Sequence, residues 1–235
     1  MLKVKFSALF LISVMFFGVF TESTFAYSQS SSDFMYSYES SMNRIQEVLS
    51  EFIIFSEDGI EVTRNKGQII SSLNQKDINN LNKLSELQGI KRDKPLTKQS
   101  IVDTYLKNIE NLNADVRDGK LEVLSNGALI DANDDHFYVQ GGVTKDQNFW
   151  WGKRRYKSTA NARTWAAELL FLSEANAAHA IIAGAVFGPM GGIPNAITGI
   201  YIANVANRVN YHNSLSNRGI IIDLHWTLTF FTRTQ

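Results

Sequence analysis

Two tryptophans stand beside four basic residues in one short stretch of the chain. The group consists of Trp150, Trp151, Lys153, Arg154, Arg155 and Lys157. Indole rings next to lysine and arginine side chains are typical of a segment that binds an anionic lipid surface. The same composition is typical of an edge strand whose tryptophans enter the core while its cations face water. The sequence leaves both interpretations open.

The longest uncharged segment of the exported part of the chain follows this stretch. Between Glu174 and Arg208 lie 33 residues without Lys, Arg, Asp or Glu. Three Gly and two Pro within residues 188–194 divide the segment into two expected helices, 175–187 and 195–207. Small residues recur in these helices at Ala180, Gly184 and Gly188, and at Gly199 and Ala203. Such spacing lets two helix backbones approach closely, in membranes and in tight soluble hairpins.

The length of the two expected helices helps to decide between a membrane and a soluble hairpin. A helix of 13 residues is about 20 Å long, against about 30 Å of bilayer hydrocarbon. The length therefore favours an apolar helical hairpin that is buried against a sheet. A hairpin that leaves the fold and enters a membrane remains the alternative.

Residues that could form a metal or catalytic site do not form a recognisable motif. The four His are scattered and Cys is absent. Asp131, Asn133 and Asp135 match the first ligands of a calcium loop, but His136 and Gly142 stand where that loop needs Gly and Glu. No nucleophile elbow, P-loop or dinucleotide fingerprint is present. We therefore expect no metal and no cofactor.

An enzyme remains an alternative, although a protein without catalysis is favoured. Asp223 and His225 fall on one face of an expected strand, where an exposed sheet surface explains both residues without chemistry. A pocket that gathers these two with a third ionisable group would favour catalysis. Their dispersal would argue against it.

Helical periodicity dominates the first half of the chain. The apolar spacing predicts helices from Ser31 to about Glu57, over 75–88, and from a Thr97 cap to Gly119. A hairpin is expected to pair Ile60–Val62 with Gln68–Ile70.

Alternation with a period of two predicts strands in the second half. The expected strands are 121–124, 127–130, 136–140, 149–156 and 219–232. The fold class is thus α+β: a helical N-terminal region and a C-terminal antiparallel sheet. The apolar helical hairpin, at about 160–212, is inserted between the last two strands.

The start of the chain predicts export. Lys3 and Lys5 precede an apolar run over 6–20 and a polar stretch that ends at Ala26, the order of a secretory signal peptide. We expect residues 1–26 to be removed and the protein to be secreted. An uncleaved membrane anchor is the alternative.

The net charge of zero hides two regions of opposite sign. Residues 27–140 contain 12 basic and 18 acidic residues, and residues 141–235 contain 9 and 4. Opposite charge favours docking of the two halves, or a role of the basic half at an anionic surface. Nine cations and an exported location make nucleic acid an unexpected partner. The expected regions are 27–120, acidic and mainly helical, and 121–235, basic and rich in strands.

Several of these segments together resemble a known group of proteins. The signal peptide, residues 109–116, Trp150-Trp151-Gly152, the apolar hairpin and Asn217–Asp223 follow one another as in a group of secreted, uncharacterised proteins of Gram-positive bacteria. The Gly/Ala-rich hairpin is also similar in composition to bacteriocin-like proteins. The resemblance implies location and domain plan, and no functional residue.

Two functions follow as expectations. One is a secreted, membrane-active antibacterial or toxin-like protein that acts through the apolar hairpin and whose acidic half shields the basic half. The membrane-interaction candidates are Trp150, Trp151, Lys153, Arg154, Arg155, Lys157, Gly184, Gly188 and Gly199. The other is a non-catalytic extracellular binding or structural module with the hairpin buried in its core.

Overall fold

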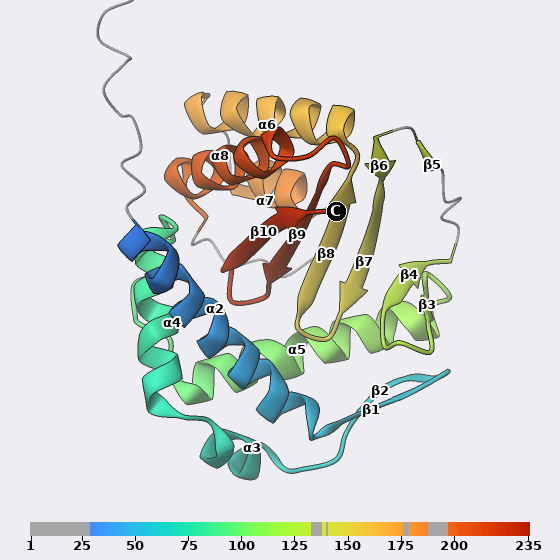
Figure 1. Ribbon diagram of the computed structural model, residues 1–235. Helices are drawn as coiled ribbons and strands as arrows, with labels where there is room; N and C mark the ends of the chain where they lie inside the picture. Colours follow the sequence, from blue (N-terminus) through green and yellow to red (C-terminus); the bar gives the residue numbers. More distant parts are fainter. Residues whose placement is uncertain (1–28, 133–137, 140, 176–178, 188–196) are drawn as a thin grey trace, which may run out of the picture. The chain divides into compact units, whose positions relative to one another are not determined.

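The computed structural model describes residues 29–132, 138–139, 141–175, 179–187 and 197–235 (Figure 1). Residues from Tyr38 onward form one compact unit, and Gln29–Ser37 belong to a separate N-terminal unit. The expected leader, residues 1–26, lies outside the described residues. All contacts below are within the unit Tyr38–Gln235.

Amphipathic helices make up most of the first half. They are α2 (Gln29–Ser50), α3 (Lys66–Ser72), α4 (Gln75–Leu87) and α5 (Lys98–Arg117). Thr97 caps α5 with a capping box, and Gly89 and Gly119 adopt positive φ just after α4 and α5. The helices expected over 75–88 and 97–119 are confirmed. Their apolar stripes form a core with Met42, Ile45, Ile78, Leu81, Leu84, Ile101, Tyr105 and Leu112 buried.

The hairpin in this half lies earlier in the chain than the sequence predicted. Strands β1 (Ile53–Ser56) and β2 (Gly59–Val62) pair with each other, so the first helix ends at Ser50 rather than near Glu57. The partner expected for β2, residues 68–70, lies in α3 instead. Asn65 and Gln68 bond reciprocally as a capping box, which begins a helix where a turn was expected.

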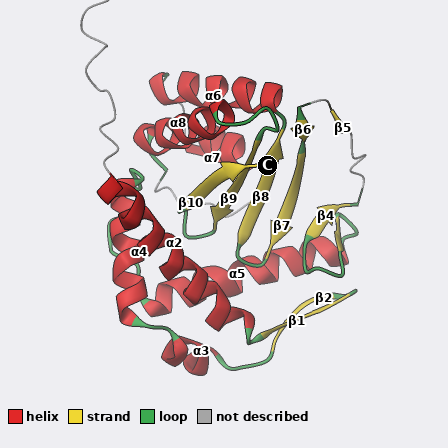
Figure 2. Ribbon diagram, in the orientation of Figure 1, coloured by secondary structure: helices red, strands yellow, loops and turns green. Residues whose placement is uncertain are grey.

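A six-stranded antiparallel sheet forms the second half. Its order is β10-β9-β8-β7-β4-β3. The strands are β3 (Leu121–Val123), β4 (Leu129–Asp131), β7 (Lys145–Phe149), β8 (Gly152–Lys157), β9 (Ile220–His225) and β10 (Phe230–Thr234). A separate short ladder pairs β5 (Tyr138–Val139) with β6 (Gly142–Val143). The α+β class with a helical first region and an antiparallel sheet is confirmed (Figure 2).

Two expected strands are each a hairpin. Phe149 pairs with Gly152, so Trp150 and Trp151 form the turn between β7 and β8. Phe230 pairs with Leu224, and the turn before it contains Leu228 at φ 65°. Period-two alternation continues through the second turn in the sequence and therefore concealed it.

Three helices are inserted between the neighbouring strands β8 and β9. They are α6 (Thr159–Glu174), α7 (His179–Phe187) and α8 (Gly199–Ser214), and they lie together beside the β8–β10 part of the sheet (Figure 1). Helices α6 and α8 pack against each other, with Ala162, Ala166 and Ala206 fully buried. The inserted apolar helices are thus confirmed. The helix contact that the sequence placed between the two uncharged arms is made chiefly by α6 and α8.

The small residues of the hairpin have different surroundings. Among the described residues, nothing lies within 4 Å of a Cβ built on Gly184, so the close contact with a described helix that was expected there is wrong. A Cβ on Gly199 would lie 3.0 Å from the carbonyl oxygen of Ser173 in α6. Gly188 lies outside the described residues.

Candidate functional site

The basic stretch of the sequence is strand β8, which lies inside the sheet and has two faces. Strand pairing sets Lys153, Arg155 and Lys157 opposite Leu224, Ile222 and Ile220. We call this the helix-covered face, because α7 lies against it. Pairing sets Arg154 opposite Asp223, on what we call the Arg154 face. The interpretation of this stretch as an edge strand with cations in water is wrong, because β7 and β9 flank β8 and helices lie over three of its cations.

Cations of the helix-covered face hold the C-terminal end of α7. Lys153 Nζ donates to the carbonyl of Phe187 at 3.1 Å, and Arg155 Nη1 donates to those of Ala185 and Val186 at 3.0 and 2.8 Å. The last carbonyls of a helix lack intrahelical donors and carry partial negative charge. A cationic donor therefore supplies the missing hydrogen bond and also interacts favourably with the helix dipole.

Trp165 in α6 completes this arrangement. Its Nε1 donates to the carbonyl of Ala185 at 3.0 Å, and the guanidinium of Arg155 lies 4.8 Å from its ring centroid. Lys157 lies 6.0 Å from the same ring. The end of α7 thus rests on two cations and one indole.

One carboxylate faces the three cations. Asp146 in β7 lies 3.1 Å from Arg155, 3.4 Å from Lys153 and 3.7 Å from Lys157. Burial alone would raise the pKa of Asp146, but the three cations hold it below its ordinary value. Burial lowers the pKa of Lys153 and of Lys157, and Asp146 opposes that effect. The cluster keeps two positive charges in excess under α7.

The Arg154 face has its own charged group. Arg154 binds both oxygens of Asp223, at 2.6 and 2.9 Å, and Arg233 binds the second oxygen at 2.7 Å. Burial raises the pKa of Asp223, but hydrogen bonds from the two arginines bring it below its ordinary value. The side chain of Arg233 is 44% exposed, so this cluster reaches solvent.

Aromatic rings surround the same cluster. Phe149 and Trp151 stack with centroids 4.9 Å apart, and the Arg154 guanidinium lies 5.5 and 5.6 Å from the two rings. His225 packs against Trp151 and Phe231, with centroids at 5.0 and 5.6 Å. These contacts form a ring platform at one end of the Arg154 face.

His225 has the surroundings of a core residue. Burial lowers its pKa to about 4, despite the opposing charge of Asp223. Its Nδ1 lies 3.4 Å from the side-chain amide of Gln46 in α2. Asp223 is occupied by two arginines, and His225 is neutral at pH 7. The pair therefore serves packing and ion pairing.

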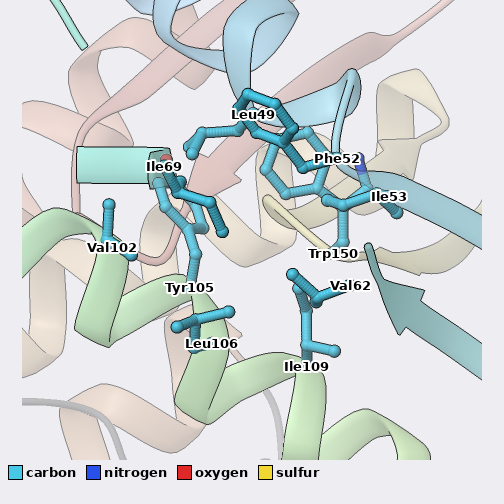
Figure 3. Close-up of a pocket in the computed structure, with 10 residues that line it drawn as sticks. All are labelled: Leu49, Phe52, Ile53, Val62, Ile69, Val102, Tyr105, Leu106, Ile109 and Trp150. Carbon is cyan, nitrogen blue, oxygen red and sulfur yellow. The ribbon is translucent and has the colours of Figure 1, made fainter. Parts of the chain in front are cut away.

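Trp150 lies apart from Trp151. It is 6% exposed and packs edge-on against Tyr105 with centroids at 5.5 Å. It borders an apolar cleft formed by α2, the β1–β2 hairpin, α3 and α5 (Figure 3). The cleft holds only about 10 Å³ of free space, little more than one water-sized sphere. It is a well-filled core contact and offers no room for a ligand.

A larger groove lies between α2 and the start of α4. It has about 310 Å³ of free space and contains the Arg44–Asp77 ion pair. Burial would raise the pKa of Asp77, but hydrogen bonds from Arg44 and Ser41 stabilise the carboxylate and hold its pKa below the ordinary value. Arg44 and Asp77, two of the charged groups that line the groove, are thus paired with each other.

The structure brings some of the sequence candidates together and separates others. Lys153, Arg155 and Lys157 share one cluster, whereas Arg154 and Trp151 lie on the opposite face. Sequence reasoning missed Asp146 and Trp165. Asp146 could have been noticed as the one acidic residue between Asp135 and Glu168, shortly before the basic stretch.

Other kinds of site were sought in the same residues. The described His, Asp and Glu residues include no group of three that could hold a metal ion. No helix in the described ranges is long and apolar enough to cross a bilayer. Of the possible calcium ligands, Asn133 and Asp135 lie outside the described residues. No protein-family model, curated protein or solved structure matches this chain.

Proposed function

We propose that this is a secreted, membrane-active antibacterial or toxin-like protein in which α7 is the segment that reaches the lipid. The observation that carries the proposal is the contact of the α7 carbonyls with Lys153, Arg155 and Trp165. If α7 departs, an apolar helix and a surface with an excess of two positive charges are uncovered in one movement. Anionic lipid attracts the cations, and the indole favours the interface.

The outer side of α7 supports this proposal. Ile181 is 58% exposed and Gly184 is exposed, although every residue of α7 after His179 is uncharged and nonpolar. A helix of nine residues is about 14 Å long, against about 30 Å of hydrocarbon. We therefore propose that α7 inserts its apolar residues into one leaflet and does not span the bilayer.

Dye release from anionic vesicles tests this function. The mature protein should release dye from vesicles rich in phosphatidylglycerol and much less from phosphatidylcholine vesicles. Trp165→Phe removes the donor to Ala185 but no charge, so it should increase the rate of release several-fold. Trp151→Phe is the matched control, because Trp151 makes no such contact, and it should leave the rate unchanged.

Two results would contradict the proposal. No release by the mature protein or by Trp165→Phe at any lipid composition would reject membrane activity. Equal acceleration by Trp165→Phe and Trp151→Phe would indicate general loosening of the fold rather than departure of α7.

A second function is favoured by the ring platform on the Arg154 face. Phe149 and Trp151 stacked beside one guanidinium form an aromatic surface with a positive charge, which suits a polymer of sugar rings and anionic groups. This supports a non-catalytic extracellular binding module whose helices stay in the core. Co-sedimentation with purified cell-wall polymer is the test: binding lost in Trp151→Ala but kept in Trp165→Phe would favour this function over the first.

A further inference from the structure

Arg92 is a half-buried cation without a countercharge among the described residues. It lies in the connector between α4 and α5, and its Nη2 donates to the carbonyl of Thr227 in the β9–β10 turn. Its Nη1 is buried and has no hydrogen-bond partner among the described residues. Among the ion pairs of the described residues, none includes Arg92. A buried guanidinium donor is thus left unmatched.

Tyr201 in α8 supplies a second unmatched group at the same junction. The residue is fully buried, and its hydroxyl has no partner among the described residues. The connector touches it, since a Cβ on Gly89 would lie 3.0 Å from the Tyr201 nitrogen. Its ring meets Phe230, just after the turn that Arg92 reaches, with centroids at 5.6 Å.

The chemistry of the two groups selects the occupant of this junction. Guanidinium has only donors and stays protonated, and a phenol hydroxyl can also donate. Burial lowers the pKa of Arg92 to about 10, which still leaves it charged at pH 7. A water molecule would accept a hydrogen bond but leave the charge uncompensated, and an unpaired buried charge is costly. An anion accepts from both donors and neutralises the cation.

We propose that a small monovalent anion of about the size of chloride binds between Arg92 Nη1 and the Tyr201 hydroxyl. The site joins the connector after α4 to α8 and to the last hairpin. Two neighbouring contacts join the same parts: Gln88 with the backbone of Phe230, and Thr198 Oγ1 with the carbonyl of Gly89 at 2.7 Å. The bound anion therefore stabilises the attachment of the helical first half to the second half.

Thermal unfolding of the intact protein in different sodium salts tests the site. At equal ionic strength, chloride and bromide should raise Tm relative to gluconate, which is too large to enter. Once chloride exceeds its Kd, each tenfold increase should raise Tm by about 3–5 °C. Equal Tm in chloride, bromide and gluconate would overturn the proposal.

Variants separate this site from general salt effects. Arg92→Gln should abolish the difference between chloride and gluconate, and Tyr201→Phe should weaken chloride affinity while keeping the ring in place. Arg64→Gln removes an exposed arginine and should keep the full difference. A chloride effect that is undiminished in both site variants would contradict the assignment.

Crystals grown in bromide give a test that does not depend on whether a variant folds. An anomalous bromide peak between Arg92 and Tyr201 is expected. A water molecule at that position, with bromide at other positions only, would overturn the proposal.

Discussion

Gly184 and Gly199 are both small residues of the apolar helices, yet only one is required by packing. No atom of the described residues lies within 4 Å of a Cβ on Gly184, so Gly184→Ala should raise the free energy of unfolding by about 0.5–1 kcal/mol through helix propensity. Gly199→Ala should lower it by about 1–2 kcal/mol, because the new methyl group would meet the Ser173 carbonyl. Urea unfolding of the two variants measures both changes. Destabilisation by Gly184→Ala would indicate a helix neighbour at that position.

His225 should make stability depend on pH. Its folded pKa of about 4 lies below the ordinary 6.5, so the unfolded chain binds the proton more readily. Stability from the neutral imidazole is complete above pH 6.5 and is lost as pH falls toward 4, by about 3 kcal/mol in total. His225→Phe should flatten this part of the profile, as measured by Tm against pH.

One other histidine has to be separated from that effect. Burial and Arg208 also lower the pKa of His212, so part of the slope should survive in His225→Phe. His212→Gln is the control and should retain most of the slope. If His225→Phe and the wild type have identical profiles, His225 is not the group that titrates.

The sequence identified the basic and aromatic residues of the site, but not the residues that each of them contacts. Successive side chains of a strand point to opposite faces of the sheet, so a strand over these residues puts Arg154 on one face and Lys153 and Arg155 on the other. Which face a helix would cover depends on contacts with α7, more than 20 residues away. Sequence spacing contains no information about that choice.

At the scale of elements, Gln88 joins α4 to the edge strand β10. Its side chain donates to the carbonyl of Phe230 at 2.7 Å and accepts from its N–H at 3.1 Å. Gln88→Ala leaves both buried backbone groups unpaired and should cost about 2–4 kcal/mol. Gln99→Ala, which removes an exposed contact with Asp103, should cost less than about 0.5 kcal/mol. Similar costs for the two variants in urea unfolding would argue against this role of Gln88.

Helices and strands whose ends are set by neighbouring residues in the sequence were predicted. Those whose ends depend on contacts with distant residues were not. Thr97 and Gly119 mark the ends of α5 within the helix itself, so its bounds follow from neighbours in sequence. The turn before Phe230 interrupts a run that keeps alternating apolar and polar residues, and the turn at Trp150-Trp151 falls within a run of bulky aromatic residues. Pairing between β8 and β9 across 62 intervening residues, Ser158–Gly219, decides where those strands end.

At the scale of the molecule, charge asymmetry is not what joins the two halves in the contacts described. Ion pairs of Asp77 and Asp103 lie in the first half, and those of Asp146 and Asp223 lie in the second. Contacts between the halves are mostly uncharged, such as Gln88 with Phe230 and Tyr105 with Trp150. Two use charge: Arg92 donates to a carbonyl, and Asp131 acts electrostatically on Lys153. The junction should therefore be insensitive to general screening by salt.

Uncharged, buried contacts of this kind predict that Tyr38–Gln235 unfolds in one cooperative step. All four Trp lie in the second half, whereas α3, α4 and α5 lie in the first. Tryptophan fluorescence and far-ultraviolet circular dichroism should therefore give the same urea midpoint, and Gln88→Ala should lower both equally. A dichroism curve with two steps, only one of which appears in fluorescence, would mean that the helical half can detach while the sheet stays folded. In that case membrane binding would more simply begin with detachment of the acidic helical half, followed by departure of α7.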